Sequence, residues 1–376
     1  MNNSKRDSSM LQIACEMTTS QGGPTRSALG VSNYLPNGHQ FVIVGNIDSS
    51  IEAILISGRI PYRTLRSDFN NKSGFCLRDL PELIKMIRKS DVIVCHGFYT
   101  FPTLISCILG KDKAVYLMPH GSLEEYEWAR SKLKKMFFDR LMEFSSNFKQ
   151  IIFTCATIEE THSIKKKYQL NRVEVVGIAV DLPEIQMLQV KATDATMNLL
   201  SISRIAPKKR IDTSIRAISL MRGTILEPNL WIYGGGDEKL TATLKKLALD
   251  LDVDKFVHFE GTIDHGDILN LFSKMDILLL PSENENFAIS VAESIAHHVP
   301  VIVSRAVALS SFVEENLCGL VIESSSPNLL KDAVLKMSSN LDFYRKACIV
   351  AKHKLGHVHV QKNWNSLLGI PTKEGF

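Results

Sequence analysis

The chain has 376 residues, a formal net charge of +4, 45% apolar residues and 22% charged residues. This composition is ordinary for a soluble globular protein, and the length favours two domains over a single core. The small charge argues against a nucleic-acid partner, and no apolar stretch reaches the roughly 20 residues of a membrane span, so we expect a cytoplasmic protein.

Short runs rich in Val, Ile and Leu alternate with helix-like segments along the chain. The runs lack a polar alternate face, which is typical of parallel strands covered by helices on both sides. They predict strands at 40–45, 91–97, 114–121, 150–156, 172–178, 198–203, 230–236, 256–261, 276–281, 299–304 and 319–323. The rhythm lapses at 181–195, where we place a linker. The prediction is an α/β protein with two doubly wound parallel sheets, since strands alternate with helices in both halves.

The seven cysteines are scattered and form no C-x-x-C pair. Several stand inside apolar runs, so we interpret them as small buried side chains in a reducing compartment. His357 and His359 in the tail lack a third ligand, so no metal site is predicted.

In folds of this kind, ligands bind beyond the carboxyl ends of the strands, so residues there are the candidate site. Near the N-terminus, Gly22 and Gly23 precede a probable helix; they either make a tight turn or let a ligand approach the backbone. His120 follows a strand. It is either a structural residue, which packs in the core or caps a turn, or a functional one, which donates to or exchanges protons with a bound polar group. His96 also follows a strand.

Basic residues follow the first strand of the second half. Arg204 and Lys209, in SRIAPKKR, form either a solvated basic turn or a diphosphate-binding pair. A glycine turn, 234–236, follows the next strand, but Lys239 stands where a dinucleotide fingerprint would need its third glycine. That fingerprint therefore fails.

The segment PSENENFAISVAES carries Glu285 and Glu293 beside a buried strand. We expect Glu285 in the loop, a helix beginning at 286–288, and Glu293 about two turns further along it. Free N–H groups at 287–289 would attract an anion between the two carboxylates. Glu285 could equally compensate the helix dipole, whereas Glu293 stands among apolar neighbours and needs a partner.

These motifs together resemble the retaining glycosyltransferases of family 4, which have the GT-B fold. The resemblance is carried by GGPTRS, PHGSLEEY, SRIAPKK, IYGGGDE and PSENENFAISVAES followed by PVIVS, and it extends over roughly residues 11–325. It implies two Rossmann-like domains with the donor site in the interdomain cleft. Residues 1–183 would bind the acceptor, 184–350 the nucleotide sugar, and 351–376 would form a helix packing back on the first domain.

The resemblance also implies roles for individual residues. Glu285 would face the transferred sugar and His120 would touch sugar or phosphate. Arg204 and Lys209 would bind the diphosphate, together with the helix start at Asn286, Phe287 and Ala288, while Glu293 would bind the ribose. The remaining donor-binding positions would be Gly22, Gly23, Gly235 and Ile263.

The implied activity is transfer of a hexose-type sugar, with retention, from a UDP- or GDP-sugar to a saccharide or lipid-linked saccharide. No metal or other cofactor would be needed, and the role would be in lipopolysaccharide or exopolysaccharide biosynthesis. Three positions depart from glycines usual in the family, namely Arg210, Ala288 and His298. An epimerase on the same fold and a non-catalytic nucleotide-sugar-binding protein are the alternatives.

The segment 128–144, WARSKLKKMFFDRLMEF, mixes basic and apolar residues. It is either an ordinary amphipathic helix packed on the first domain or a surface helix for an anionic bilayer. The second interpretation predicts peripheral contact with the inner face of the membrane.

Overall fold

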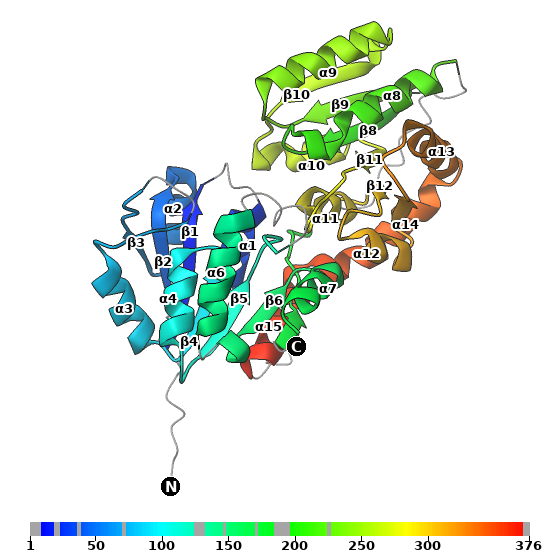
Figure 1. The fold of residues 1–376 in the computed structure, drawn as a ribbon. Helices are drawn as coiled ribbons and strands as arrows, with labels where there is room; N and C mark the ends of the chain where they lie inside the picture. The colour runs from blue at the N-terminus through cyan, green and yellow to red at the C-terminus, as the bar shows by residue number, and fades with distance from the viewer. Residues whose placement is uncertain are drawn as a thin grey trace. The chain divides into compact units, whose positions relative to one another are not determined.

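The computed structural model describes residues 9–18, 23–35, 39–69, 73–123, 132–145, 148–169, 172–183, 196–223 and 227–370. The chain divides into two compact units, one formed by Met1–Ile178 with Val360–Phe376 and the other by Ala179–His359 (Figure 1). Each unit contains one parallel sheet. The expected linker at 181–195 lies mostly outside the described residues.

The first unit has a seven-stranded sheet in the order β3-β2-β1-β4-β5-β6-β7. Every neighbouring pair is parallel. The strand order reverses direction between β1 and β4, which is the switch point where ligands bind in such sheets. The strands are β1 Met10–Met17, β2 Gln40–Ile47, β3 Tyr62–Leu65, β4 Val92–His96, β5 Ala114–Met118, β6 Ile152–Cys155 and β7 Arg172–Val175.

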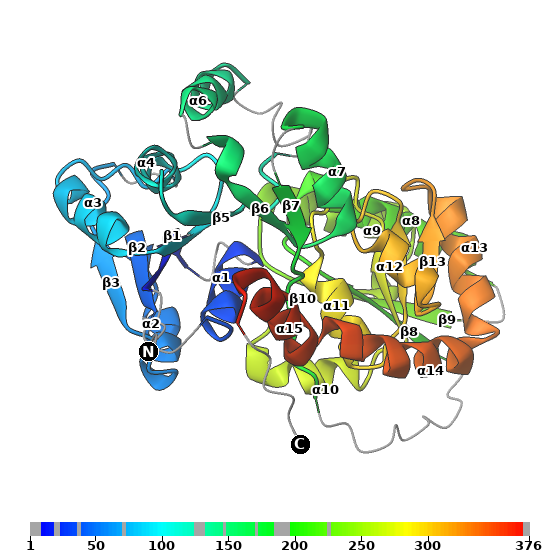
Figure 2. The same ribbon diagram turned by 90° about the horizontal axis from the view of Figure 1, so that it is seen from below.

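Helices cover both faces of this sheet (Figure 2). One face carries α3 Leu80–Lys89, α4 Phe101–Leu109, α6 Lys132–Phe144 and α7 Ile158–Lys167. The other face carries α1 Gly23–Ser32, α2 Ser49–Ser57 and the C-terminal α15 His357–Leu368. A short 3-10 turn, η2 Phe148–Gln150, leads into β6.

Successive residues of β5 show how the two faces are filled. Val115 and Leu117 belong to the apolar cluster beneath α3, α4 and α7. Tyr116 points to the other face, where its ring packs edge-on against the buried Trp364 of α15, with 6.4 Å between the ring centroids. The alternation is the two-residue period of a strand, and it places the C-terminal segment against the first unit's sheet.

The second unit has a six-stranded parallel sheet in the order β10-β9-β8-β11-β12-β13. Its switch point lies between β8 and β11. The strands are β8 Thr196–Ile202, β9 Glu227–Tyr233, β10 Val257–Gly261, β11 Ile277–Leu280, β12 Val301–Ser304 and β13 Gly319–Ile322.

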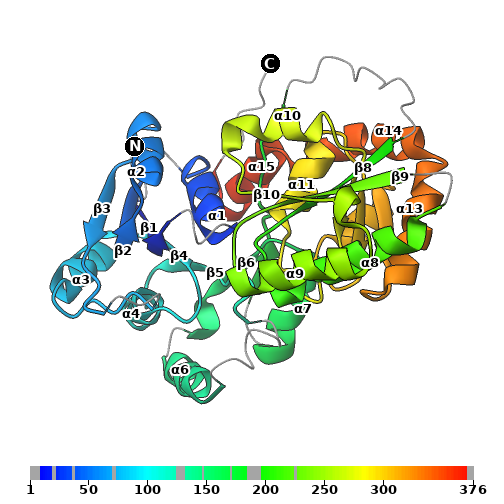
Figure 3. The same cartoon turned by 90° about the horizontal axis from the view of Figure 1, so that it is seen from above.

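Helices α8 and α9 lie on the face opposite α10, α11 and α14 (Figure 3). Buried side chains of α8, α9 and α13 share one apolar cluster with alternate residues of the strands. The helices are α8 Ile211–Met221, α9 Glu238–Asp250, α10 Ile268–Phe272, α11 Ile289–Ala296, α12 Ser310–Glu315, α13 Pro327–Ser338 and α14 Leu341–Ala351. The 3-10 turns are η3 Pro207–Lys209, η4 Asp254–Phe256, η5 His265–Asp267 and η6 Lys352–Leu355.

The predicted α/β class with two doubly wound parallel sheets is confirmed, and every predicted strand is present. Two strands were not predicted. β1 is an inner strand of the first sheet, between β2 and β4, and β3 is its short edge strand. Within the described residues, none of the helices is both long and apolar enough to cross a bilayer.

Candidate functional site

Arg204, Lys209 and Glu285 follow β8 and β11, two strands that end side by side in the second sheet. β8 is followed by Arg204, whose side chain is exposed, and then by η3, which ends at Lys209. Lys209 is largely buried, with 9% of its surface exposed. A lysine in this position needs a counter-charge because burial penalises its charged form.

That counter-charge is Glu285, in the loop after β11. The Lys209 ammonium group and the Glu285 carboxylate form an ion pair, with 10% and 18% of their side chains exposed. The backbone of Glu285 is fixed as well, because its N–H donates to the Ala306 carbonyl (3.2 Å) and its carbonyl accepts from the Ala308 N–H (2.9 Å). The structure therefore holds the carboxylate in one place on the strand-end loop.

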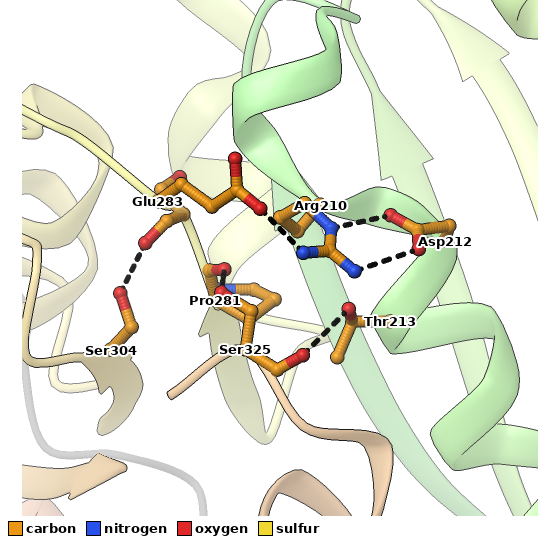
Figure 4. Close-up of polar contacts among 8 residues, drawn as sticks. Arg210, Asp212, Thr213, Pro281, Glu283, Ser304 and Ser325 are labelled. Carbon is orange, nitrogen blue, oxygen red and sulfur yellow. Dashed lines mark hydrogen bonds and ion pairs between the residues drawn. The ribbon is translucent and has the colours of Figure 1, made fainter. Parts of the chain in front are cut away.

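A second ion pair holds the same two segments together. Arg210 donates from Nη1 to Glu283 (2.5 Å) and from Nε to Asp212 (3.1 Å), as Figure 4 shows. The N–H of Glu283 also donates to the Lys208 carbonyl (2.8 Å). Two ion pairs and one backbone bond thus join the basic turn after β8 to the acidic loop after β11.

Hydroxyl groups fix the base of this loop. The Ser304 hydroxyl donates to the Ser282 carbonyl, and the Ser325 hydroxyl donates to the Pro281 carbonyl (2.5 Å). Thr213 of α8 in turn donates to the Ser325 carbonyl (3.2 Å), so the loop is linked to a third segment (Figure 4). A site built on such a supported loop is pre-organised.

Helix α11 begins later than predicted. Its first residue is Ile289, and Ala288 stands before it in the left-handed region at φ 62° and ψ 67°. The expected start at 286–288 is therefore one to three residues too early, because the left-handed backbone of Ala288 does not belong to a right-handed helix. Asn286 is half-buried, Phe287 and Ala288 are buried, and they form the turn into the helix.

Glu293 is buried on α11, with 8% of its surface exposed, as its apolar neighbours predicted. As expected, Glu285 lies in the loop after β11 and Glu293 lies on the helix that follows it. The two carboxylates are therefore placed by the same strand-loop-helix segment.

The glycine turn after β9 packs against the backbone that leads to Arg204. A Cβ on Gly234 would lie 1.9 Å from the Ser203 carbonyl oxygen, and one on Gly236 would lie 2.3 Å from that of Ile205. Gly235, the predicted site residue, has more room, with Thr262 Cγ2 at 3.2 Å. Ile263 is half-buried just after β10, the strand next to β9.

The positions predicted to depart from family glycines share one backbone feature. Arg210, Ala288 and His298 all have left-handed backbones, with φ of 51°, 62° and 62°. Residues with a Cβ are strained in this region, whereas glycine adopts it freely. The departures therefore keep a glycine-like backbone while carrying side chains.

In the first unit, Gly22 lies outside the described residues, and Gly23 is the first residue of α1. The Thr25 hydroxyl donates to the Thr18 carbonyl (2.9 Å), which fixes the start of α1 against the end of β1. The helix start thus lies at the first unit's switch point, beside the end of β4.

His120 follows β5 and is half-buried, with a left-handed backbone at φ 53°. Its Nε2 lies 3.0 Å from Nδ1 of His96, the last residue of β4. The next N–H, of Gly121, donates to the buried Glu160 (2.8 Å). Burial lowers the pKa of His120 to about 4, and burial with the neighbouring His120 ring lowers the pKa of His96 well below its ordinary value. Both imidazoles are therefore neutral at pH 7.

The sequence did not single out Gln12, Glu160 or Glu283, although all three support predicted residues. Thr157 and Glu160 show the T-x-x-E spacing of a capping box, which signalled a helix start but not the contact with Gly121. Gln12 and Glu283 carry no local signal, because their partners come from distant segments. Across the described part of the chain, no three His, Cys, Asp or Glu side chains are grouped to hold a metal ion.

The region holding the second unit's site matches a known family. Residues 189–353 match the model of the family described as glycosyl transferases group 1. A curated relative from Corynebacterium glutamicum, a GDP-mannose-dependent monoacylated alpha-(1-6)-phosphatidylinositol monomannoside mannosyltransferase, is 28% identical over 180 residues. The match covers 46% of this chain and 45% of that relative, so the chain spans about half the length of the curated relatives it matches.

Solved structures resemble the whole chain in fold. The Anabaena protein Alr3699/HepE in complex with UDP-glucose has a TM-score of 0.75 at 14% identity, covering 96% of this chain and 99% of that one. WaaG, a glycosyltransferase involved in lipopolysaccharide biosynthesis, has a TM-score of 0.67 at 15% identity, covering 96% and 100%. The chain therefore has the α/β GT-B fold, and its residues 189–353 match the group 1 glycosyl transferase family.

Proposed function

We propose that this protein is a retaining glycosyltransferase that moves a hexose-type sugar from a UDP- or GDP-sugar to a saccharide or lipid-linked saccharide. The second unit would bind the donor and the first unit the acceptor, without a required metal. The chemistry would serve cell-surface polysaccharide biosynthesis, such as lipopolysaccharide or exopolysaccharide assembly.

One observation carries this proposal. The Lys209–Glu285 ion pair joins the ends of β8 and β11 at the switch point, inside the residues that match the family model. A cation there suits a phosphate, and a fixed carboxylate beside it suits the hydroxyl groups or developing charge of a sugar. Both groups would suit an enzyme that breaks a sugar–diphosphate bond.

The other residues of the second unit take supporting roles. Arg204 and Lys209 would bind the diphosphate, with N–H groups around Asn286, Phe287 and Ala288 facing the same charge. Glu293 would accept hydrogen bonds from the ribose hydroxyls. Gly235 and Ile263 would flank the base.

In the reaction, the bond between the anomeric carbon and the β-phosphate oxygen breaks, and a bond from the acceptor oxygen to that carbon forms. The acceptor's proton passes to the leaving diphosphate, whose negative charge Arg204 and Lys209 stabilise. His120 is neutral and can donate an N–H to sugar or phosphate, while Gly22 and Gly23 let the donor approach the backbone. Glu285 would face the sugar that is transferred.

The similar proteins point to two donor chemistries. The Corynebacterium relative is named for GDP-mannose and for a phosphatidylinositol mannoside, and the Anabaena structure holds UDP-glucose. These support a nucleotide diphosphate sugar as donor and favour testing lipid-linked acceptors beside free saccharides.

The test is a panel of UDP- and GDP-sugars assayed for nucleotide release with and without saccharide and lipid-linked acceptors. The proposal expects acceptor-dependent release with one donor and a product that keeps the donor's anomeric configuration. Epimerisation of the donor without transfer, or nucleotide-sugar binding without turnover of any donor, would contradict it.

We also propose peripheral contact of the first unit with an anionic membrane through α6. Its outer face exposes Leu133 (82%), Phe137 (68%) and Phe144 (83%), among basic side chains such as Lys134 and Arg140. Residues 128–131 of the predicted segment lie outside the described residues.

The inner face of α6 is anchored by a polar cluster. Buried Asp139 accepts from Lys167 (2.6 Å) and from the Tyr168 hydroxyl (2.7 Å), and Met142 is buried in the core beside it. The helix is therefore held by one side, while apolar and basic groups together remain on the other.

Co-sedimentation with phosphatidylglycerol-containing vesicles at low salt tests this contact. Phe137→Ser should weaken binding, whereas Ile56→Ser, which removes a similarly exposed apolar side chain from α2, should not. Equal binding to neutral phosphatidylcholine vesicles, or no binding to either, would contradict the proposal.

A further inference from the structure

A chain of buried polar side chains runs from helix α1 through the first sheet to His120. Gln12 on β1 is fully buried, and His96 at the end of β4 is 6% exposed. Gln12 Nε2 lies 2.9 Å from His96 Nε2, and His96 Nδ1 lies 3.0 Å from His120 Nε2. Each ring nitrogen of His96 therefore has one partner.

The orientation of the Gln12 amide follows from its other contacts. Its nitrogen lies 2.7 Å from the Ala28 carbonyl oxygen, which can only accept a hydrogen bond, so the amide donates there. Its oxygen accepts from the Ser32 hydroxyl at 2.8 Å. Exchanging the oxygen and nitrogen would set two acceptors against each other at the Ala28 carbonyl.

This orientation decides which ring atoms carry protons. The Gln12 nitrogen is a donor only, so His96 Nε2 accepts and the proton of neutral His96 is on Nδ1. His96 Nδ1–H then donates to His120 Nε2, which leaves the proton of neutral His120 on Nδ1. Both rings are neutral at pH 7 because burial lowers their pKa values.

We propose that Gln12 and His96 are positioning residues that hold His120 in the Nδ1–H tautomer, so that it presents an N–H donor to the oxygen of a bound ligand. A second contact fixes the backbone of this turn. Glu160 accepts from the Gly121 N–H (2.8 Å) and from the Ala156 N–H (2.9 Å), which secures the left-handed turn at His120. Side-chain tautomer and backbone direction are thus set by different residues.

The nature of the ligand oxygen, sugar or phosphate, rests on the proposed function, but the tautomer does not. The first experiment therefore needs no ligand. Long-range proton–nitrogen NMR of protein labelled with ¹⁵N-histidine distinguishes the two tautomers at each ring, with exposed His162 as an internal reference. The expected result is Nδ1–H for both His96 and His120, and an Nε2–H or mixed state at His120 would overturn the proposal.

Two variants test whether the hydrogen bond from His96 causes the Nδ1–H tautomer of His120. His96→Leu removes the donor, and we expect His120 to shift toward the Nε2–H tautomer. His96→Asn can place an amide N–H near the position of Nδ1, and we expect it to restore the Nδ1–H state. An unchanged His120 tautomer in folded His96→Leu would overturn the proposal. If His96→Leu does not fold, Gln12→Met is the substitute. It removes the donor that fixes the tautomer of His96, so His120 should again lose its Nδ1–H state.

A kinetic assay separates the proposed positioning role from the proposed transferase activity. With the donor found by the panel, His96→Leu should lower kcat/KM roughly 10- to 100-fold, as expected for a disturbed hydrogen-bond donor, and His96→Asn should recover most of it. If both histidines are Nδ1–H but the parent shows no transferase activity, the proposed function is contradicted and the tautomer assignment stands. Full activity in His96→Leu, with His120 shifted to Nε2–H, would overturn the positioning role alone.

Discussion

Lys209 and Glu285 form an ion pair that links the ends of β8 and β11, two adjacent strands at the switch point of the second sheet. They lie far apart in the sequence, and each is supported separately. Lys209 ends η3, whereas Glu285 is held by backbone bonds to the 306–308 segment. The pair therefore fixes a cation beside a carboxylate at the strand ends, where the proposed function would use the cation for phosphate and the carboxylate for the sugar.

This ion pair predicts that replacing Lys209 weakens nucleoside diphosphate binding, whereas replacing Glu285 does not. Lys209→Ala removes a charged hydrogen bond to phosphate and should weaken UDP or GDP binding roughly 10- to 100-fold. Glu285→Gln releases Lys209 from its carboxylate, so binding should be unchanged or tighter. Isothermal titration calorimetry measures both.

The matched control for that comparison is Asp250→Asn, which breaks an exposed Lys246–Asp250 pair on α9. It should leave the affinity for either nucleotide unchanged. Equal weakening by Glu285→Gln and Lys209→Ala would show that the carboxylate does not compete with the phosphate for Lys209.

The left-handed backbone of Ala288 predicts that glycine is better at this position. Its φ of 62° is unfavourable for a residue with a Cβ by about 1 kcal/mol, part of which is offset by the greater chain entropy of glycine. Ala288→Gly should therefore raise the midpoint of thermal unfolding by about 1–3 °C.

Ala292→Gly, in the interior of α11, is the control. Glycine there should lower stability by roughly 1 kcal/mol, since the backbone is helical and the methyl group is fully buried. Differential scanning calorimetry compares the two. A similar loss in both variants would contradict the assigned strain at Ala288.

The glycine turn after β9 predicts a sharp contrast between neighbours. Gly234→Ala would place a methyl group 1.9 Å from the Ser203 carbonyl oxygen, at a backbone φ of 139°. The segment leading to Arg204 must then move, so we expect a loss of roughly 2–4 kcal/mol in unfolding free energy and weaker nucleotide binding.

Gly235→Ala is the partner experiment, because its methyl group would meet only the end of the Thr262 side chain. Its unfolding free energy should change by less than about 1 kcal/mol. Chemical denaturation measures the unfolding free energies of both variants. Comparable losses at the two positions would contradict this account of the turn.

Buried His298 predicts acid sensitivity of the second unit. The side chain is 5% exposed, and neither ring nitrogen has a hydrogen-bond partner among the described residues. Burial first, then the charges of Lys352, His297 and His353, lower its pKa to about 4. The unfolded chain, with an ordinary pKa near 6.5, binds the proton first, so stability falls as the pH drops from about 6.5 towards 4.

His298→Asn removes this titration while keeping a residue that tolerates the left-handed backbone. Between pH 7 and 5 the parent should lose about 1–2 kcal/mol more unfolding free energy than the variant. His96 and His120 titrate in both proteins, so the difference isolates His298. Parallel pH profiles for parent and variant would contradict the prediction.

The sequence predicted most of the sheets because buried parallel strands are apolar throughout. It did not predict β1, since MLQIACEM contains Gln12 and Glu16. Gln12 is tolerated on this inner strand because Ala28, Ser32 and His96 satisfy its amide. Such pairing is tertiary and has no local signature.

In the candidate site too, some features had a local sequence signal and others did not. Residue types at strand ends indicated Lys209, Glu285 and His120, because the doubly wound pattern fixes where strand ends gather. The later start of α11 could not be predicted locally, since alanine favours helix and the left-handed backbone of Ala288 is visible only in the structure. In the sequence, Arg210 and Ala288 stood out only as departures from glycine.

The initial rate of nucleotide release in Glu285→Ala, beside the parent and Asp250→Asn, tests the central claim most directly. It is measured with the donor and acceptor that the parent uses best. The account predicts a fall of at least about 100-fold for Glu285→Ala, because a group facing the reacting sugar is lost, and parental activity for Asp250→Asn. Full activity in a folded Glu285→Ala variant would contradict it.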